Sequence, residues 1–280
     1  MPVTRVAVSA DRVVLGYPGK VALDASTFVI PSGSVTAVIG PNGSGKSTLL
    51  NAIAGLIEPV SGSLDVPDRT NGARHISYVL QLTKVNDALP ITVREVVAMG
   101  RYPGHRFHRR FTGADRNAIA DAMQRTGIDS LGGRHLLELS GGQRQRVFVA
   151  QGLAQDHQVL LLDEPLTGID LPTAQAIDEV IHDERSRGCT VIMTTHDLSE
   201  AMVADYVVLL SGRVVAAGIP AEVLTGANLT EAYGQALMHI EEGAVFIDDP
   251  AHIPIPGRRA GVRRTIHTDS NPSDVHGQGA

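Results

Sequence analysis

The stretch Gly40-Pro41-Asn42-Gly43-Ser44-Gly45-Lys46-Ser47 decides the fold of this chain. Its pattern is G-x-x-x-x-G-K-S, with an apolar run over 34–39 before it and a run with helical spacing over 47–54 after it. A strand, a glycine-rich loop and a helix in this order form the usual setting of a phosphate-binding loop. The glycines permit backbone conformations in which successive N–H groups face phosphate oxygens. The sequence therefore predicts a binding site for a nucleoside triphosphate.

The residues of this loop have different expected roles. The helix start favours an anion through its dipole and unpaired amides, Lys46 is expected to reach the β- and γ-phosphates, and the Ser47 hydroxyl to ligate Mg²⁺. The alternative is a glycine-rich turn that precedes a lysine by chance, and the flanking strand and helix argue against it. The candidate cofactor-binding residues of this stretch are Gly40, Pro41, Asn42, Gly43, Ser44, Gly45, Lys46, Ser47 and Thr48.

Composition excludes several other classes of protein. The chain has 280 residues, of which 43% are hydrophobic and 19% charged, and its net charge of −6 argues against a general nucleic-acid binder. A single cysteine, Cys189, excludes an internal disulfide and a cysteine-rich zinc site. We find no signal peptide and no run of 18 apolar residues. We therefore expect a cytosolic protein that reaches the membrane through partners.

The first third of the chain predicts strands. Residues 3–30 alternate between apolar and polar with a turn at 17–20, which indicates an antiparallel group. Tyr17 precedes that turn, and from its position alone an ordinary turn aromatic is favoured over a ring stacked on adenine. A further strand over 76–80 ends at Gln81, whose amide could face Mg²⁺ or an attacking water, although such a residue is usually only a solvated strand end.

The pattern becomes helical over about 82–155. Thr92 and Glu95 fit a capping box, and Thr112 or Asp115 is expected to cap the next helix. The basic and aromatic segment 101–111 is interpreted as a contact loop for a partner or for headgroups, with a plain surface loop nearly as well supported. A second glycine-rich helix start follows at Leu139-Ser-Gly-Gly-Gln143, with Ser140 as its N-cap.

Two apolar runs without alternation predict central parallel strands. The first covers 159–162 and ends in Asp163 and Glu164, and the second covers 190–195 and ends in His196. A crossover helix is expected between them, because Pro172 suits a first helical turn. Since ligands bind at the carboxyl ends of parallel strands, these side chains are expected to lie at the crevice edge.

Residues 241–280 are interpreted as a C-terminal extension, and from about Asp248 as a disordered tail rich in Pro, Gly, Arg, Ser and His. His252, His267 and His276 lie in it, with His239 just before it. A metal-chelating tail is conceivable, but the wide spacing of the histidines favours a solvated tail.

The motifs together resemble the ATP-binding subunit of ABC transporters over roughly residues 5–238. The phosphate loop, the signature Leu139–Gln143, the acidic strand end at Asp163 and Glu164, and His196 follow one another in that family's order. The resemblance implies an α/β fold: a P-loop NTPase sheet with an antiparallel β group and an inserted α-helical subdomain at about 82–155, all within an ABC domain over 1–240.

The resemblance also implies roles for individual residues. Asp163 would orient the Mg²⁺ shell, Glu164 would be the general base or water-orienting residue, and His196 would contact the γ-phosphate. Gln81 matches the glutamine that couples the nucleotide site to membrane subunits. Tyr17 matches the aromatic that stacks on adenine, which reverses the interpretation from position alone.

A dimer with ATP in its interface is the implied active unit. The signature residues Ser140, Gly141, Gly142 and Gln143 would close over the nucleotide of a partner subunit, and Asp170 matches a dimer-contact aspartate. The implied partners are a second ATPase subunit, integral-membrane permease subunits and, indirectly, an extracytoplasmic metal-binding protein, with no nucleic acid.

The segments 89–102 and 168–173 resemble importer subunits for zinc and manganese. Importers of iron-siderophores share part of the first segment and remain an alternative. A non-transport ABC ATPase fits less well, because the sequence has one phosphate loop, one signature and no long heptad run. The expected location is the cytoplasmic face of the cell membrane.

Overall fold

The computed structural model describes residues 5–70, 75–81, 90–104, 110–234, 238–241 and 244–247. Its strands are β1 Val6–Tyr17, β2 Lys20–Pro31, β3 Val35–Ile39, β4 Ser61–Asp65, β5 Ile76–Val79, β6 Val159–Leu162, β7 Thr190–Thr195, β8 Tyr206–Leu210, β9 Val214–Gly218, β10 Met238–Glu241 and β11 Ala244–Ile247. Its α-helices are α1 Lys46–Ile53, α2 Pro67–Thr70, α3 Val93–Ala98, α4 Gly113–Arg125, α5 Gly141–Leu153, α6 Leu171–Ser186, α7 Leu198–Val203, α8 Pro220–Val223 and α9 Gly226–Tyr233. Short 3₁₀ turns are η1 Met99–Gly104, η2 Asp129–Leu131 and η3 Leu136–Glu138.

A six-stranded sheet forms the centre of the described part, in the order β5-β6-β7-β3-β8-β9. The pairs β5–β6, β6–β7, β7–β3 and β3–β8 are parallel, and β9 returns antiparallel to β8. The two runs without alternation are β6 and β7, which lie side by side inside the sheet. The prediction of central parallel strands is confirmed.

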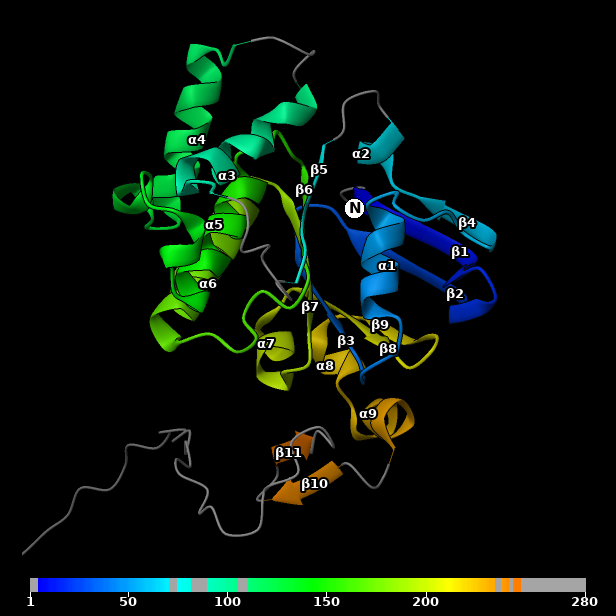
Figure 1. The fold of residues 1–280 in the computed structure, drawn as a ribbon. Coiled ribbons are helices and arrows are strands. Elements are labelled where there is room, and N and C mark those ends of the chain that lie inside the picture. Colours follow the sequence, from blue (N-terminus) through cyan, green and yellow to red (C-terminus); the bar gives the residue numbers. More distant parts are fainter. Residues whose placement is uncertain are drawn as a thin grey trace, which may run out of the picture.

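A smaller antiparallel sheet covers one side of the molecule. Among the described strands it has the order β2-β1-β4, and β1 and β2 pair across the turn at 17–20 as predicted. Helix α1 lies between this sheet and the central sheet (Figure 1). It presents Leu49, Leu50 and Ile53 to apolar side chains from both sheets.

The period-2 alternation of the central strands divides the core in two. Val38, Leu161 and Ile192 face α1 and the small sheet. Their chain neighbours, such as Leu160 and Leu162, face the helical side, where α3, α4, α5 and α6 lie (Figure 1). Both faces of the sheet are therefore covered, which explains why β6 and β7 read as continuous apolar runs.

The helices begin where the sequence predicted. Thr92, Thr112 and Ser140 are N-caps, and each forms a complete capping box with the residue three positions later. Each box satisfies two backbone donors that a helix start leaves unpaired.

Arg101 differs from the interpretation of segment 101–111 as a contact loop, whereas Tyr102 and Arg110 are exposed and leave that interpretation a prediction. Arg101 lies in a 3₁₀ turn and points inward, with Nε 2.9 Å from Asp115 and Nη1 2.8 Å from Asp156. Tyr102 and Phe111 stack with their ring centroids 5.6 Å apart. The first cation of the segment thus stabilises the helical layer, and residues 105–109 lie outside the described residues.

Several other expectations fall on residues outside the described set. These are 82–89 and most of the predicted tail, including His252, His267 and His276. The pair β10–β11 is antiparallel and lies at the start of the predicted extension, with His239 on β10 just before it. The predicted division into an ABC domain, a helical subdomain and an extension stays a prediction.

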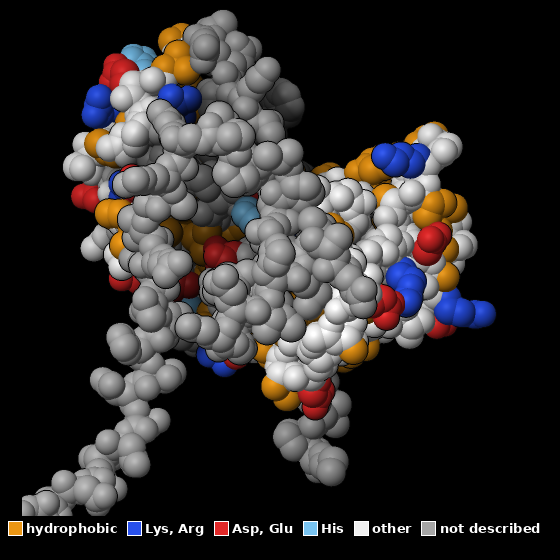
Figure 2. All heavy atoms as spheres, turned by 90° about the horizontal axis from the view of Figure 1, so that it is seen from below, with side chains coloured by type: hydrophobic (Ala, Val, Ile, Leu, Met, Phe, Trp, Pro, Cys, Tyr) orange, Lys and Arg blue, Asp and Glu red, His pale blue; other side chains and the backbone are white. Residues whose placement is uncertain are grey.

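The surface carries charges of both signs. Figure 2 shows basic and acidic side chains interspersed with apolar ones over the described surface on this face, including the lobe formed by β1, β2 and β4. Among the described helices, none is long and apolar enough to cross a membrane.

We expect Leu161→Ala to lower the free energy of unfolding by about 2–5 kcal/mol, because Leu161 is fully buried beneath α1 and truncation leaves a cavity. Leu56→Ala is the matched control, since Leu56 is 65% exposed and its truncation should cost less than about 0.5 kcal/mol. Urea denaturation followed by circular dichroism measures both. Equal denaturation midpoints for the two variants would contradict this account of the core.

Candidate functional site

The central strands bring the predicted site residues to one edge of the sheet. Ile39 pairs with Thr195, Leu162 with Met193, and Val79 with Leu162. The segments that follow β3, β5, β6 and β7 therefore leave the sheet next to one another. These segments carry the phosphate loop, Gln81, the two carboxylates and His196.

The loop after β3 has the backbone conformation for which its glycines were predicted. Gly40, Gly43 and Gly45 have φ angles of 153°, 79° and 103°. A Cβ on Gly40 would lie 2.2 Å from the carbonyl O of Leu210, so this position also needs glycine for close packing. Gly45 is the N-cap of α1 and provides no side-chain cap, which leaves the first amides of the helix available to a bound anion.

Two polar side chains of the loop point to a phosphate ligand. Lys46 is 7% exposed, and its Nζ donates to the carbonyl oxygens of Gly40 (2.8 Å) and Pro41 (3.3 Å), which holds the ammonium group over the loop. Ser44 Oγ is buried and has no hydrogen-bond partner among the described residues. An unpartnered buried hydroxyl is costly unless a ligand satisfies it, so the loop fits a bound polyphosphate.

Asp163 connects the loop to the strand ends. Its Oδ1 accepts a hydrogen bond from Thr194 Oγ1 at 2.6 Å and from Ser47 Oγ at 3.3 Å. A carboxylate next to a hydroxyl gives two oxygen ligands of the kind that Mg²⁺ prefers. The donor set therefore fits the predicted magnesium site.

Glu164 is held in an unusual position. Its φ angle is 48°, a left-handed conformation that is rare for a residue with a Cβ. Its amide donates to Thr194 Oγ1 at 2.8 Å, and its Oε2 accepts from Gln81 Nε2 at 2.7 Å. Backbone strain of this kind persists only where neighbouring groups hold it, and it is concentrated at functional sites.

These elements surround a cavity of about 520 Å³. From the predicted set it is lined by Tyr17, Asn42, Gly43, Gly45, Lys46, Ser47, Thr48, Gln81 and Glu164. Tyr17 is 45% exposed, and its hydroxyl accepts a hydrogen bond from Asn51 on α1 at 3.0 Å. An aromatic ring fixed at the rim of a phosphate cavity is suited to stacking on a base.

Other predicted residues lie outside the lining of this cavity. His196 is exposed and follows β7, next to the end of β3 but not among the lining residues. The signature residues Ser140, Gly141, Gly142 and Gln143 form the start of α5 and do not contribute to the cavity. Asp170 caps α6 by accepting from the Thr173 amide at 2.9 Å.

The starts of α5 and α6 are packed together. A Cβ on Gly142 would lie 2.6 Å from Thr173 Oγ1, so glycine is needed for this contact. The hydrogen bonds from Thr173 lower the pKa of the exposed Asp170 carboxyl and keep it ionised. Gly141 beside it is exposed.

Sequence reasoning missed two residues of the site. Thr194 binds both carboxylate residues at once, and Tyr78 on β5 is near Asp163, where burial and then the Asp163 charge raise the pKa of its phenol. The buried pair Thr194–Thr195 at the end of an apolar strand was the available signal for the first. No sequence signal pointed to Tyr78, because a tyrosine in a strand is common in any core.

The family model described as ABC transporter matches residues 23–167. The chain is 35% identical to the manganese transport system ATP-binding protein MntA of Synechocystis sp., over 82% of this chain and 91% of that protein. It is 38% identical to the zinc transport system ATP-binding protein TroB of Treponema pallidum, over 82% and 88%. It is 36% identical to the ferric enterobactin transport ATP-binding protein FepC of Escherichia coli, over 86% and 89%.

A solved structure of a metal-chelate type ABC transporter in an inward-facing conformation contains a chain of similar fold. The TM-score is 0.73 at 26% identity, and the alignment covers 86% of this chain and 96% of that one. The structural alignment and the sequence alignments thus cover similar shares of this chain.

We expect Lys46→Ala to weaken ATP binding at least tenfold, because it removes the ammonium group that the loop carbonyls position over the cavity. Lys20→Ala is the matched control, since Lys20 lines the same cavity outside the phosphate loop. Titration of each variant with a fluorescent ATP analogue measures the dissociation constant. An unchanged affinity of Lys46→Ala for the ATP analogue would contradict a role of Lys46 in ATP binding.

Proposed function

We propose, from the premise that this chain belongs to the ABC transporter family, that it energises the import of a divalent metal, zinc or manganese, by hydrolysing ATP. As a member of this family the chain binds ATP and is an ATP hydrolase. The observation that carries the site assignment is the meeting of the phosphate loop, Gln81 and Glu164 around one cavity. The relatives that transport zinc and manganese support the cargo.

The geometry supports a distinct role for each residue at the cavity. Lys46 and the amides at the start of α1 bind phosphate oxygens and stabilise the charge that develops on them. Glu164, held by Gln81 and Thr194, orients a water molecule and accepts its proton. His196 is proposed to contact the terminal phosphate, which requires its exposed side chain to turn toward the loop.

Ser47 and Asp163 would hold Mg²⁺, and Gln81 would join them from the segment that follows β5. When bound, the ion neutralises charge on the β- and γ-phosphates. Thr194 donates to the same Asp163 oxygen and so fixes the orientation of this carboxylate, as outer-shell groups do at metal sites.

The remote position of the signature residues supports a homodimer. Ser140–Gln143 form a helix start, exposed at Ser140 and Gly141, that lies outside the lining of the nucleotide cavity. A helix N-terminus with glycine at its surface binds phosphate readily, so a second copy can place its phosphate loop opposite. We propose that two ATP molecules lie in this interface, with Asp170 at the contact.

The remaining partners follow from the proposed transport role. The relatives are ATP-binding proteins of transport systems, and we propose that this chain docks on integral-membrane permease subunits at the cytoplasmic face. An extracytoplasmic binding protein would deliver the metal. No residue of this chain needs to touch the cargo, so the site alone does not select the metal.

Import of an iron chelate is the second candidate. FepC is as similar to this chain as the manganese and zinc proteins, at 36% identity. The nucleotide site would work identically in either case, since cargo recognition lies in other subunits.

Glu164→Gln should bind ATP and accumulate as a stable dimer, because the amide fills the same space but cannot accept a proton. Light scattering with ATP and Mg²⁺ measures the mass, and the turnover should fall at least a hundredfold, in the range expected for loss of a general base. Glu179→Gln on the outer side of α6 is the control and should turn over normally. A monomeric Glu164→Gln protein with normal turnover would refute the role of Glu164.

The cargo is tested by measuring cellular metal content in a strain that lacks this protein, grown under zinc or manganese limitation. We expect a selective fall in one of these metals, restored by the wild-type chain but not by Lys46→Ala. Unchanged zinc and manganese together with lost uptake of iron-siderophore would overturn the proposed cargo in favour of the chelate.

A further inference from the structure

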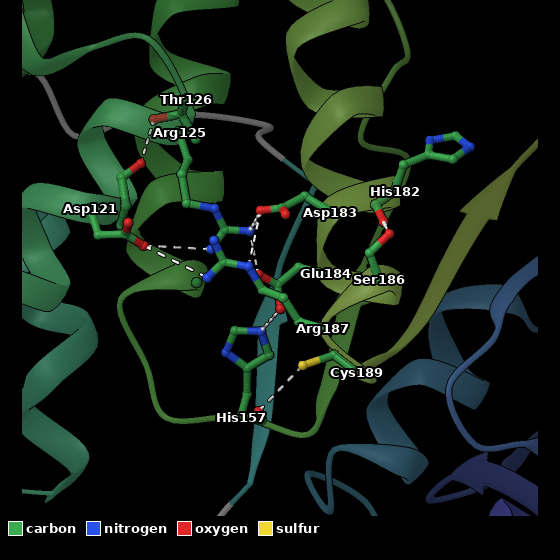
Figure 3. A network of polar contacts seen from close by, with 12 residues as sticks. Asp121, Arg125, Thr126, His157, His182, Asp183, Glu184, Ser186, Arg187 and Cys189 are labelled. Atoms are coloured by element: carbon green, nitrogen blue, oxygen red, sulfur yellow. Dashed lines mark hydrogen bonds and ion pairs between the residues drawn. The ribbon is translucent and has the colours of Figure 1, made fainter.

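A second cluster of chemically active side chains lies at the opposite edge of the central sheet, away from the nucleotide cavity. His157 precedes β6, Cys189 precedes β7, and Glu184 belongs to the last turns of α6 (Figure 3). Val159 pairs with Thr190 in the parallel register, so the two strand starts are neighbours. The three side chains are thereby brought together from distant parts of the chain.

The three side chains present ligand atoms of different kinds to one point. A ring nitrogen of His157, a carboxylate oxygen of Glu184 and Cys189 Sγ all lie within 4.8 Å of one another. The side chains of His157 and Glu184 are 6% and 3% exposed, and Cys189 is 9% exposed. Ligands of one tetrahedral zinc ion lie roughly 3–4 Å apart, given bonds of about 2.0–2.3 Å, so only a small adjustment would complete the set.

The imidazole of His157 faces two acceptors. Its Nδ1 lies 2.8 Å from the carbonyl O of Gln155, and its Nε2 lies 2.9 Å from Glu184 Oε2. A neutral imidazole has one N–H and satisfies only one acceptor. If Nδ1 carries the N–H, Nε2 can face the Glu184 carboxylate favourably only when it is protonated as well or when a metal ion lies between the two groups. An Nδ1–H bonded to a backbone carbonyl leaves Nε2 directed at the ion, as in known metal sites.

The charged side chains that line the cavity beside the cluster balance one another. Arg101, Arg125 and Arg187 lie with Asp121, Asp156 and Glu184 around it. This lining carries no excess of positive charge that would exclude a divalent ion.

The cluster also has room for an ion. A cavity of about 350 Å³ is lined by His157, Glu184 and Cys189 together with Arg125 and Arg187. Three protein ligands with an adjoining cavity leave one coordination position for water.

We propose that His157, Glu184 and Cys189 form a binding site for a thiophilic divalent cation of the zinc type. The site uses none of the nucleotide-binding residues, so its test gives a result that does not depend on the proposed transport role. Its partners in the outer shell are the Gln155 carbonyl, which fixes the His157 tautomer, and Arg125, which binds the second oxygen of Glu184.

Proton release accompanies binding. The S–H bond of Cys189 breaks as the S–metal bond forms, and the proton passes to solvent. The Glu184 carboxylate is bound by Arg125 from α4 through one oxygen and faces His157 Nε2 through the other.

Titration of the full-length, tag-free chain with Co²⁺ tests the site. Because Cys189 is the sole cysteine, thiolate-to-metal charge-transfer absorption reports this residue alone. We expect that absorption in the wild type, its displacement by Zn²⁺, its loss in Cys189→Ser, and a drop in affinity of about tenfold or more in His157→Gln. His182→Gln is the matched control, since His182 is exposed on α6, and it should bind Co²⁺ as the wild type does.

Alkylation of Cys189 in the wild type is a second measurement, which tests the site even if the variants fold poorly. In the wild type, Zn²⁺ should slow alkylation of Cys189 at least tenfold, and in His157→Gln this protection should fall. Absence of charge-transfer absorption and of protection in the folded wild type would overturn the proposal. Equal Co²⁺ affinity in His157→Gln and the wild type would overturn it too.

Discussion

The parallel pairing of β3, β6 and β7 is the constraint on which the rest of the structure depends. Parallel register places all carboxyl ends at one edge and all amino ends at the other. The loop after β3 and the carboxylates after β6 can therefore approach within hydrogen-bond distance, as Ser47 and Asp163 do. The nucleotide cavity and the proposed cation site each lie at one of these two edges.

Polar groups at the carboxyl edge are arranged around a single hydroxyl. Thr194 Oγ1 donates to Asp163 and accepts from the Glu164 amide, so it fixes one carboxylate and the strained backbone of the next residue together. This arrangement directs the carboxylates of two adjacent acidic residues to different partners. Asp163 faces the loop, and Glu164 faces Gln81.

The amino edge has a different chemistry because another set of loops meets there. Residues 32 positions apart, His157 and Cys189, become neighbours at the starts of β6 and β7, and α6 adds Glu184. The arginine of α4 that binds Glu184 connects this edge to the helical layer. A ligand at the amino edge would therefore act on the contact between helices and sheet, while the nucleotide acts on the other edge.

The sequence by itself determined the local structure and the nucleotide chemistry of this protein. Spacing of glycines, Lys46 and Ser47 fixes a phosphate loop because only a few backbone conformations satisfy it, and the capping boxes at Thr92, Thr112 and Ser140 are local interactions within four residues. The continuous apolar runs identified β6 and β7, because a strand that is covered on both faces needs apolar side chains at every position. Tertiary structure alone decided which distant groups meet: Thr194 with Asp163, Arg101 with Asp115, and His157 with Glu184 and Cys189. Such contacts depend on strand order and register, which no local pattern encodes.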